Sequence, residues 1–202
     1  MKIIRMDKEK LRKEIKEKVS VTVQNIVAKI DIGQKIPLKD VAKYFRDFQV
    51  KFNPSKFPGL IIKMRDSISV LLFSSGKMVC TGAKTEKDID DVINIIIDKL
   101  KEAGITLKSK PIVSIENVVA TVNLGIDLAL EKLIYELPNA IYEPELFPGI
   151  IYRIEHPEDP GREFVYLLFR TGRCVCTAAK NEEELRKAVD LLIDSLVEVI
   201  AE

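Results

Sequence analysis

Two segments of the chain carry apolar residues at the spacing of an amphipathic helix. The first stripe consists of Ile89, Val92, Ile93, Ile96 and Leu100. The second consists of Leu185, Ala188, Val189, Leu192 and Leu196, each 96 positions after its counterpart. Steps of three and four residues return to one side of a helix, so the pattern predicts two long helices that each bury one face. Thr85 with Asp88, and Asn181 with Glu184, provide starts that resemble a capping box.

Stretches rich in β-branched residues precede these helices. Residues 19–30 and 112–122 are predicted to be strands, and each is followed by a glycine and a short helix, at residues 38–48 and 127–137. Three or four further strands separate the short helix from the long one. Each half is therefore predicted to run strand, short helix, several strands and long helix, which is an α+β arrangement.

The predicted strands are apolar at nearly every position, as in IVAKI, SVLLF and KMVCT. An antiparallel sheet with one wet face should alternate, so both faces of this sheet require cover. Four helices can cover only one face of a sheet of about ten strands. The other face would present Val27, Leu71, Phe73, Val79, Val119, Leu167, Phe169 and Val175. An uncovered apolar surface of this size is expected to bind a partner.

The chain contains an internal duplication. QNIVAKIDIG at residues 24–33 recurs as ENVVATVNLG at 116–125, KFPGLIIK at 56–63 as LFPGIIYR at 146–153, and SGKMVCTGAK at 75–84 as TGRCVCTAAK at 171–180. Blocks repeated in the same order indicate a duplicated structural unit. We predict a charged N-terminal extension at residues 1–18, a first repeat at 19–110 and a second repeat at 111–202.

Two segments depart from the duplication. The extension is strongly charged and has only a weak helical pattern through Ile4, Leu11 and Ile15, so it is predicted to be frayed or solvated. The second repeat carries six additional residues within HPEDPGRE, at residues 156–163. Pro157, Pro160 and Gly161 form turns readily, and we expect a solvent loop there. Neither segment has a function that the sequence reveals.

Composition limits the compartment and the chemistry. The formal net charge is +1 although 31% of the residues are charged, which does not exclude an anionic partner. The start of the chain lacks the apolar core of a signal peptide, and no apolar run approaches the roughly 20 residues of a membrane span, which predicts an intracellular soluble protein. Three cysteines, an odd number, favour free thiols in a reducing compartment. Cys80 and Cys176 are equivalent and are predicted to be small core residues.

Catalysis and metal binding find little support. The one histidine, His156, lies in the inserted segment and so belongs to no arrangement shared by both repeats. Cys174 and Cys176 form C-x-C without a second pair of ligands, which is a poor zinc signature. SSGK at residues 74–77 lacks the upstream glycine of a phosphate loop, and Met78 stands where serine or threonine is required. We expect neither enzymatic activity nor a cofactor.

The doubled blocks NIVA, FPG, LLF-x-x-G and V-x-T-x-A-K, with a helix after each copy, resemble the TATA-box-binding protein family of general transcription factors. The resemblance covers residues 19–202. It implies a pseudo-twofold saddle, with a curved antiparallel sheet of about ten strands and four helices on the convex face. It further implies that the concave face binds AT-rich TATA elements in the minor groove and bends the DNA.

The resemblance assigns residues to three kinds of DNA contact. Intercalating wedges are implied at Phe57, Phe73, Phe147 and Phe169. Minor-groove base contacts are implied at Asn25, Asn117, Thr81, Thr177, Val27, Val79, Val119, Val175, Leu71 and Leu167. Phosphate contacts are implied at Lys63, Lys77, Lys84, Arg153, Arg173, Lys180, Ser75 and Thr171. If about six phosphates are neutralised, the log–log salt slope should be roughly −5.

The resemblance also implies protein partners. The loop before Phe147 carries Glu143, Glu145 and Leu146, which map onto the contact for transcription factor B, and RNA polymerase would follow indirectly. A weak homodimer in the absence of DNA is a further expectation. An archaeal source would place the protein in the cytoplasm or nucleoid, and abundant Ile, Lys and Glu are compatible with an archaeal thermophile.

A different class of protein would also explain the apolar face. An interaction protein could close a homodimer or enclose a lipid with this surface, but that reading leaves the paired asparagines, threonines and cations unexplained. Two substitutions between the repeats are expected to be tolerated. Ala178 replaces the equivalent of Gly82, and Arg173 with Cys174 replaces Lys77 with Met78.

Overall fold

The computed structural model describes residues 7–64 and 67–201. Contacts between Cα atoms divide the chain into two compact units, residues 24–117 in one and residues 1–23 with 118–202 in the other. These compact units differ from the sequence repeats predicted at residues 19–110 and 111–202. The repeat boundaries describe the duplication of the sequence, and they stay a prediction. The N-terminal residues join the second unit because the first helix packs against the last one.

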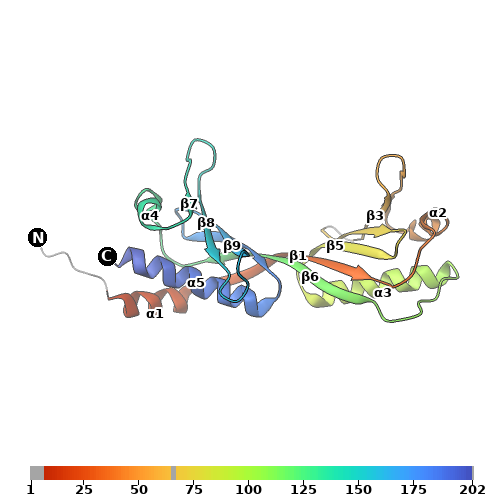
Figure 1. Ribbon diagram of the computed structural model, residues 1–202, viewed down its shortest axis with the longest axis horizontal. Helices are drawn as coiled ribbons and strands as arrows, with labels where there is room; N and C mark the ends of the chain where they lie inside the picture. The colour runs from red at the N-terminus through yellow and green to blue at the C-terminus, as the bar shows by residue number, and fades with distance from the viewer. Residues whose placement is uncertain (1–6, 65–66, 202) are drawn as a thin grey trace, which may run out of the picture. The chain divides into compact units, whose positions relative to one another are not determined.

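The order of elements agrees with the predicted repeat. After helix α1 (Lys8–Lys18), the first series is β1 (Ser20–Asp31), α2 (Leu38–Val41), the 3-10 turn η1 (Ala42–Phe45), β2 (Gln49–Lys51), β3 (Gly59–Lys63), β4 (Ser69–Phe73), β5 (Lys77–Ala83) and α3 (Glu86–Glu102). The second series is β6 (Ile112–Asn123), α4 (Leu130–Glu136), β7 (Ala140–Ile141), β8 (Ile150–Glu155), β9 (Glu163–Leu168), β10 (Arg173–Ala179) and α5 (Glu182–Ile200). Figure 1 shows the two series.

The strands form a ten-stranded antiparallel sheet, which confirms the predicted fold class. Hydrogen-bonded neighbours follow the order β2-β3-β4-β5-β1-β6-β10-β9-β8-β7. Within each unit the long helix contacts one face, α3 against β5 and α5 against β10. Both predicted apolar stripes are buried, and the core of each unit therefore lies between its long helix and this face of the strands.

Both long helices begin as the sequence predicts. The Thr85 hydroxyl accepts a hydrogen bond from the Asp88 N–H at 3.1 Å, and the Asp88 carboxylate accepts one from the Thr85 N–H at 2.9 Å. The Asn181 side chain accepts from the Glu184 N–H at 2.8 Å. These bonds satisfy N–H groups that have no partner within a helix, which explains why α3 and α5 start at these positions.

The expectation of a frayed or solvated extension is wrong for residues 8–18. These residues form α1, which Asp7 caps, and α1 packs along α5 with Leu11 and Ile15 buried (Figure 1). Arg12 pairs with Asp194 and Lys16 with Asp190, each at 2.7 Å. Lys8 pairs with Glu198 in the same way. The charges that suggested solvation are complementary to the acidic face of α5, and Ile4 lies outside the described residues.

The cysteines are reduced and buried. Burial raises the pKa of Cys80 to about 11 and that of Cys174 and Cys176 to about 12, so all three thiols stay protonated near neutral pH. They contribute small apolar volume to the core, as the sequence predicts for Cys80 and Cys176. None of the described helices is long and apolar enough to cross a lipid bilayer.

Candidate nucleic-acid interface

Strand positions alternate between full and partial burial, although the sequence is apolar at nearly all of them. In β4 and β5, Val70, Leu72, Met78 and Cys80 are buried, while the intervening Leu71 and Val79 are half-buried. Helix α3 packs against β5 on the side of the first set. The second set lies on the opposite side of the strands, because consecutive residues of a strand point to opposite faces. The partly exposed face therefore carries the predicted groove contacts, all of which are half-buried.

The register of the strands aligns these residues into rows. In the first repeat, Ile61 pairs with Leu71 and Leu71 with Val79. Val79 in turn pairs with Lys29 of β1. The corresponding row of the second repeat is Ile151, Leu167, Val175 and Thr121. Direct cross-strand partners share a face, so each row extends the predicted contacts by two residues. Ile61, Ile151, Lys29 and Thr121 carry no sequence signal for this face, because their place on it depends on strand register.

The four predicted wedges form two matched pairs. The ring centroids of Phe57 and Phe73 are 5.8 Å apart, and those of Phe147 and Phe169 are 5.7 Å apart. Each pair packs over the glycine of its FPG block. A Cβ atom added at Gly59 would lie 2.7 Å from a Phe57 ring carbon, and one at Gly149 would lie 3.0 Å from a Phe147 ring carbon. A side chain at either position would force the neighbouring ring to shift.

The amide of Asn25 is oriented by its own repeat. Its Oδ1 atom accepts a hydrogen bond from the Gly82 N–H at 2.6 Å and one from the Thr81 hydroxyl at 3.4 Å. Because only the oxygen can accept from a backbone N–H, the NH2 group is the end of the amide turned away from Gly82. This orientation presents hydrogen-bond donors. Asn117 and Thr177 occupy the equivalent half-buried positions of the second repeat.

The Ala178 substitution is tolerated with backbone strain. Gly82 has φ +90°, and a Cβ atom there would lie 1.8 Å from the Ser67 carbonyl oxygen. Ala178 takes the same left-handed conformation, with φ 77°. An L-residue with a side chain pays roughly 1 kcal/mol for this conformation. The second repeat therefore keeps the turn at the cost of stability.

A hollow lies beside each phenylalanine pair. The first, of about 560 Å³, is lined by Lys29, Ile30, Asp31, Pro58, Phe73, Ser74, Ser75, Lys77, Met78, Val79, Ile112 and Ser114. The second, of about 400 Å³, is lined by Thr121, Pro148, Phe169, Arg170, Thr171, Arg173, Cys174 and Val175. Each hollow combines a phenylalanine ring, hydroxyl groups and cationic side chains, and the first also contains the carboxylate of Asp31. This combination suits a ligand with apolar faces and negative charge, such as a sugar-phosphate backbone.

The remaining predicted phosphate contacts, Lys63, Lys84, Arg153 and Lys180, do not line these hollows. Lys63, Lys84 and Lys180 are exposed. Arg153 is half-buried and pairs with Glu163 at 3.5 Å. The backbone N–H of Lys84 donates to Asp88, and that of Lys180 donates to Glu184. The caps of α3 and α5 thus fix the backbone at Lys84 and Lys180 and leave both lysine side chains exposed.

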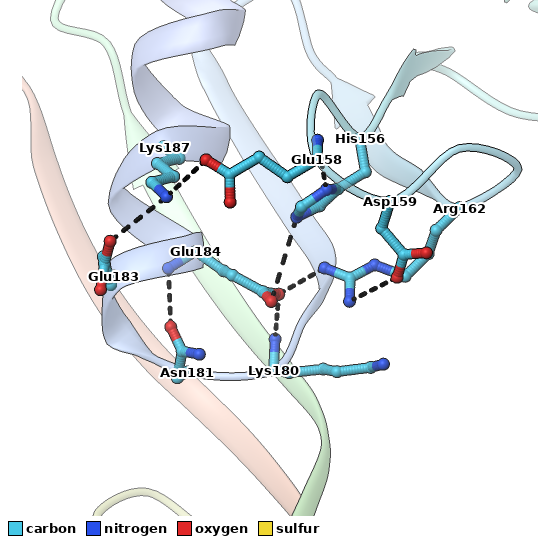
Figure 2. Close-up of polar contacts among 9 residues, drawn as sticks. All are labelled: His156, Glu158, Asp159, Arg162, Lys180, Asn181, Glu183, Glu184 and Lys187. Atoms are coloured by element: carbon cyan, nitrogen blue, oxygen red, sulfur yellow. Dashed lines mark hydrogen bonds and ion pairs between the residues drawn. The ribbon is translucent and has the colours of Figure 1, made fainter.

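The inserted segment is anchored rather than simply solvated. Pro157, Pro160 and Gly161 are exposed as expected, but His156 is only 5% exposed and packs against Phe164, with ring centroids 4.9 Å apart and planes tilted by 46°. Figure 2 shows His156 and Arg162 converging on Glu184 at the start of α5. The Nε2 atom of His156 lies 3.9 Å from the carboxylate, and a guanidinium nitrogen of Arg162 lies 2.5 Å from it. The prediction of a solvent loop is therefore wrong for His156 and Arg162, which pack against Glu184.

Glu184 joins this loop to the cap of α5. Burial disfavours its ionised form, but the Lys180 backbone N–H and the Arg162 guanidinium outweigh that effect and lower the pKa of Glu184. The carboxylate accepts the Lys180 N–H at 2.9 Å. On the helix side, Lys187 pairs with Glu158 of the loop at 3.0 Å (Figure 2). The loop therefore stabilises the helix start that follows Lys180.

The two loops that precede the phenylalanines share a backbone and differ in side chains. The N–H groups of Leu146 and Phe147 donate to the Glu143 carbonyl, and those of Lys56 and Phe57 donate to the Asn53 carbonyl, at 2.9 to 3.0 Å. Glu143, Glu145 and Leu146 are exposed, Leu146 to 81%. An acidic loop with an exposed leucine suits a partner surface that is basic and apolar. The first-repeat loop, which carries Asn53, Ser55 and Lys56, lacks both the acidic charge and the leucine.

Catalytic and metal chemistry gain no support from the geometry. Across residues 7–64 and 67–201, no group of three or more His, Cys, Asp and Glu side chains could hold a metal ion. The buried histidine contacts Glu184 and the aromatic ring of Phe164, and the Nδ1 atom accepts the Glu158 N–H at 3.1 Å. These contacts describe a structural histidine that anchors a loop.

Comparisons with known proteins agree with the duplicated architecture. The family described as "Transcription factor TFIID (or TATA-binding protein, TBP)" matches residues 20–103 and 112–199. The chain is 41% identical over 187 residues to the TATA-box-binding protein of Sulfurisphaera tokodaii, covering 92% of this chain and 91% of that protein. It is 40% identical over 181 residues to that of Pyrobaculum aerophilum, covering 89% and 87%.

A solved structure shows the same fold. The structure described as Methanococcus jannaschii TBP superposes with a TM-score of 0.80 at 35% sequence identity. The match covers 89% of this chain and 99% of that chain.

Proposed function

The chain belongs to the TATA-binding protein family, a family of DNA-binding transcription factors rather than of enzymes, and from this we propose how its residues act. It binds AT-rich TATA elements in the minor groove, bends them by phenylalanine insertion and recruits transcription factor B, through which RNA polymerase follows. The observation that carries the proposal is the pair of matched phenylalanine clusters, each beside a hollow lined with a hydroxyl and cations.

The half-buried rows act as the floor of the interface. Leu71, Val79, Leu167 and Val175 offer apolar surface to sugars and base edges. Asn25 offers its NH2 group, since its oxygen is held by Gly82. The minor groove exposes acceptors at A·T pairs in either orientation, whereas guanine adds an amino group that would meet this donor. The floor therefore favours A·T pairs without distinguishing A·T from T·A.

The phenylalanine pairs act as wedges. Insertion of apolar side chains between base steps is the established way in which this family kinks DNA, and we carry it over to Phe57 with Phe73 and to Phe147 with Phe169. The packing of both rings on a glycine supports the role, because it holds them in place before DNA arrives. Preorganised rings lose little conformational freedom on binding.

The cations and hydroxyls position the duplex. Lys77 with Ser75, and Arg173 with Thr171, line the two hollows and would contact phosphates flanking each kink. Lys63, Lys84, Arg153 and Lys180 complete the set. The acidic loop with Glu143, Glu145 and Leu146 would receive transcription factor B. Without DNA, the same apolar rows would support a weak homodimer, and DNA binding should dissociate it.

A gel-shift titration tests the proposal. A short duplex with a TATA element is compared with a G·C-substituted duplex, using the wild type and the Phe57→Ala/Phe147→Ala variant. We expect selective binding by the wild type, loss of that binding in the variant, and a log–log salt slope of roughly −5. Equal binding to both duplexes, or a slope near zero, would contradict minor-groove recognition and favour a dimerisation or lipid-binding face.

A further inference from the structure

The two halves of the candidate DNA-binding face differ in charge at one equivalent position. Lys29 occupies the end of the first-repeat row, next to Val79, and Thr121 occupies the same place next to Val175. Both line the hollow of their own repeat. Equivalent rows of the two repeats thus end in different groups: the ammonium group of Lys29 in the first repeat and the hydroxyl group of Thr121 in the second.

The ammonium group of Lys29 is held by a carboxylate. Its Nζ atom lies 2.7 Å from Oε2 of Glu116, and Oε1 of the same carboxylate accepts the Ser114 hydroxyl at 3.0 Å. Ser114 lines the first hollow together with Lys29, Phe73 and Val79, so this pair borders the predicted groove contacts. The equivalent of Glu116 in the first repeat is Gln24, an uncharged residue.

We propose that Lys29 is an additional DNA contact made only by the first repeat, and that the Lys29–Glu116 pair helps set the direction in which the protein lies on an asymmetric promoter. The inference rests on the proposed function. The Lys29 side chain is 65% exposed, and its direct cross-strand neighbour is a predicted groove contact. A ligand seated on Val79 therefore lies within reach of the Lys29 ammonium group.

The charges of Lys29 and Glu116 explain how this pair could influence the orientation of the protein on DNA. The negative charge of the Glu116 carboxylate repels nearby phosphates, and the Lys29 ammonium group offsets that repulsion in the free protein. When DNA binds, Lys29 can bond to groove acceptors or to a phosphate as well as to Glu116. Narrow A-tract minor grooves concentrate negative potential and attract cations. The first repeat should therefore prefer the half-site with the A-tract, whereas Thr121 carries no such preference.

Single substitutions test the contact. Lys29→Thr removes the ammonium group that pairs with Glu116 beside the DNA, so we expect a loss of affinity of about tenfold and a salt slope smaller by about one. Glu116→Gln should increase affinity, and Lys29→Thr/Glu116→Gln should recover only part of the loss, because the Lys29 contact is still missing. Full recovery would mean that repulsion by Glu116 explains the loss and would overturn the contact. Unchanged affinity and slope in Lys29→Thr would overturn the contact.

Directional cleavage tests the orientation. An iron chelate is attached to Ser55→Cys, an exposed site in the first-repeat loop, since the three native cysteines are buried. Cleavage is mapped on a duplex with an A-tract in one half of the AT-rich element. We expect the wild type to cut mainly beside the A-tract half. Lys29→Thr/Glu116→Gln should cut both ends nearly equally, and adding Gln24→Glu/Thr121→Lys should reverse the preference.

The outcomes separate the two proposals. Selective binding with an unchanged cleavage ratio in Lys29→Thr/Glu116→Gln would overturn the directional role and leave the proposed function intact. Failure of the wild type to select the AT-rich duplex would overturn the proposed function, and this inference with it.

Discussion

Phe147 and Phe169 meet edge to face, with ring centroids 5.7 Å apart and planes inclined by 62°, over the backbone of Gly149. The first repeat reproduces this relationship with Phe57 and Phe73. Residues 22 positions apart in one repeat and 16 in the other thus reach the same geometry. The inserted residues extend the hairpin between them and leave its base unchanged, because β8 and β9 begin and end beside the rings.

Replacement of the supporting glycine should disturb the wedge. In Gly149→Ala, the new Cβ atom would lie 2.8 Å from the Leu168 carbonyl and about as close to both rings, so the rings must separate. We expect unfolding free energy to fall by about 1–3 kcal/mol, and DNA affinity and bending by fluorescence energy transfer to decrease. Gly104→Ala is the control for a loss of stability far from the rings: φ is +79° there, so alanine is strained, but no atom lies within 4 Å of the added Cβ atom. Equal DNA effects in both variants would contradict the wedge role.

Charge reversal in the second-repeat loop should separate DNA binding from partner binding. Glu143→Lys/Glu145→Lys alters two exposed side chains, so stability should change by less than about 0.5 kcal/mol. The binary complex with DNA should persist, while the ternary complex with transcription factor B should disappear in a gel shift. Asn53→Lys/Ser55→Lys makes the matched change in the first-repeat loop and should leave the ternary complex intact. Loss of DNA binding in the second-repeat variant would count against the assignment.

Docking of the N-terminal helix should depend on Ile15. This side chain is fully buried, and Ile15→Ala should weaken the docking of α1 on α5 by about 2–4 kcal/mol. Hydrogen exchange of α1 would then accelerate, while DNA affinity should stay the same. The exposed Lys13→Ala substitution on the same helix is the control and should change protection little. Slow exchange of α1 in Ile15→Ala would show that the contact contributes little.

The inserted loop should make stability depend on pH through Glu184. Its pKa is lowered in the folded state, so its contribution is present above the unfolded value of about 4.3 and is lost as pH falls through the folded value. Glu184→Gln should cost about 1–2 kcal/mol at pH 7 by urea denaturation, and the difference from wild type should shrink below pH 4. A constant difference from pH 7 to pH 3 would contradict this account.

Replacing the strained Ala178 by glycine should stabilise the fold. Ala178→Gly relieves the left-handed conformation, and we expect a gain of about 0.5–1 kcal/mol in unfolding free energy. The reciprocal Gly82→Ala should lose at least about 2 kcal/mol, because its Cβ would strike the Ser67 carbonyl. Thermal unfolding of both variants checks the pair. A destabilised Ala178→Gly would mean that the Cβ atom packs favourably.

The sequence by itself determined the features that depend on local spacing. The duplication, the two apolar stripes of α3 and α5 and their capping residues are all encoded within short windows, and the structure confirms the stripes and the caps. The four wedge phenylalanines were implied by the family resemblance, whereas their packing into two ring pairs is seen only in the structure. Periodicity and capping act over a few residues, so they can be identified without knowledge of distant contacts.

Tertiary structure alone decided which side of each apolar strand stays exposed. Val79 and Cys80 are both apolar in sequence, and the packing of α3 on one face of β5 distinguishes them. Docking of α1 required the acidic side chains of α5, about 180 residues away. The pairing of Lys29 with Glu116 likewise joins two strands that lie far apart in the chain. Such contacts depend on strand register and charge complementarity between distant segments, which no local pattern records.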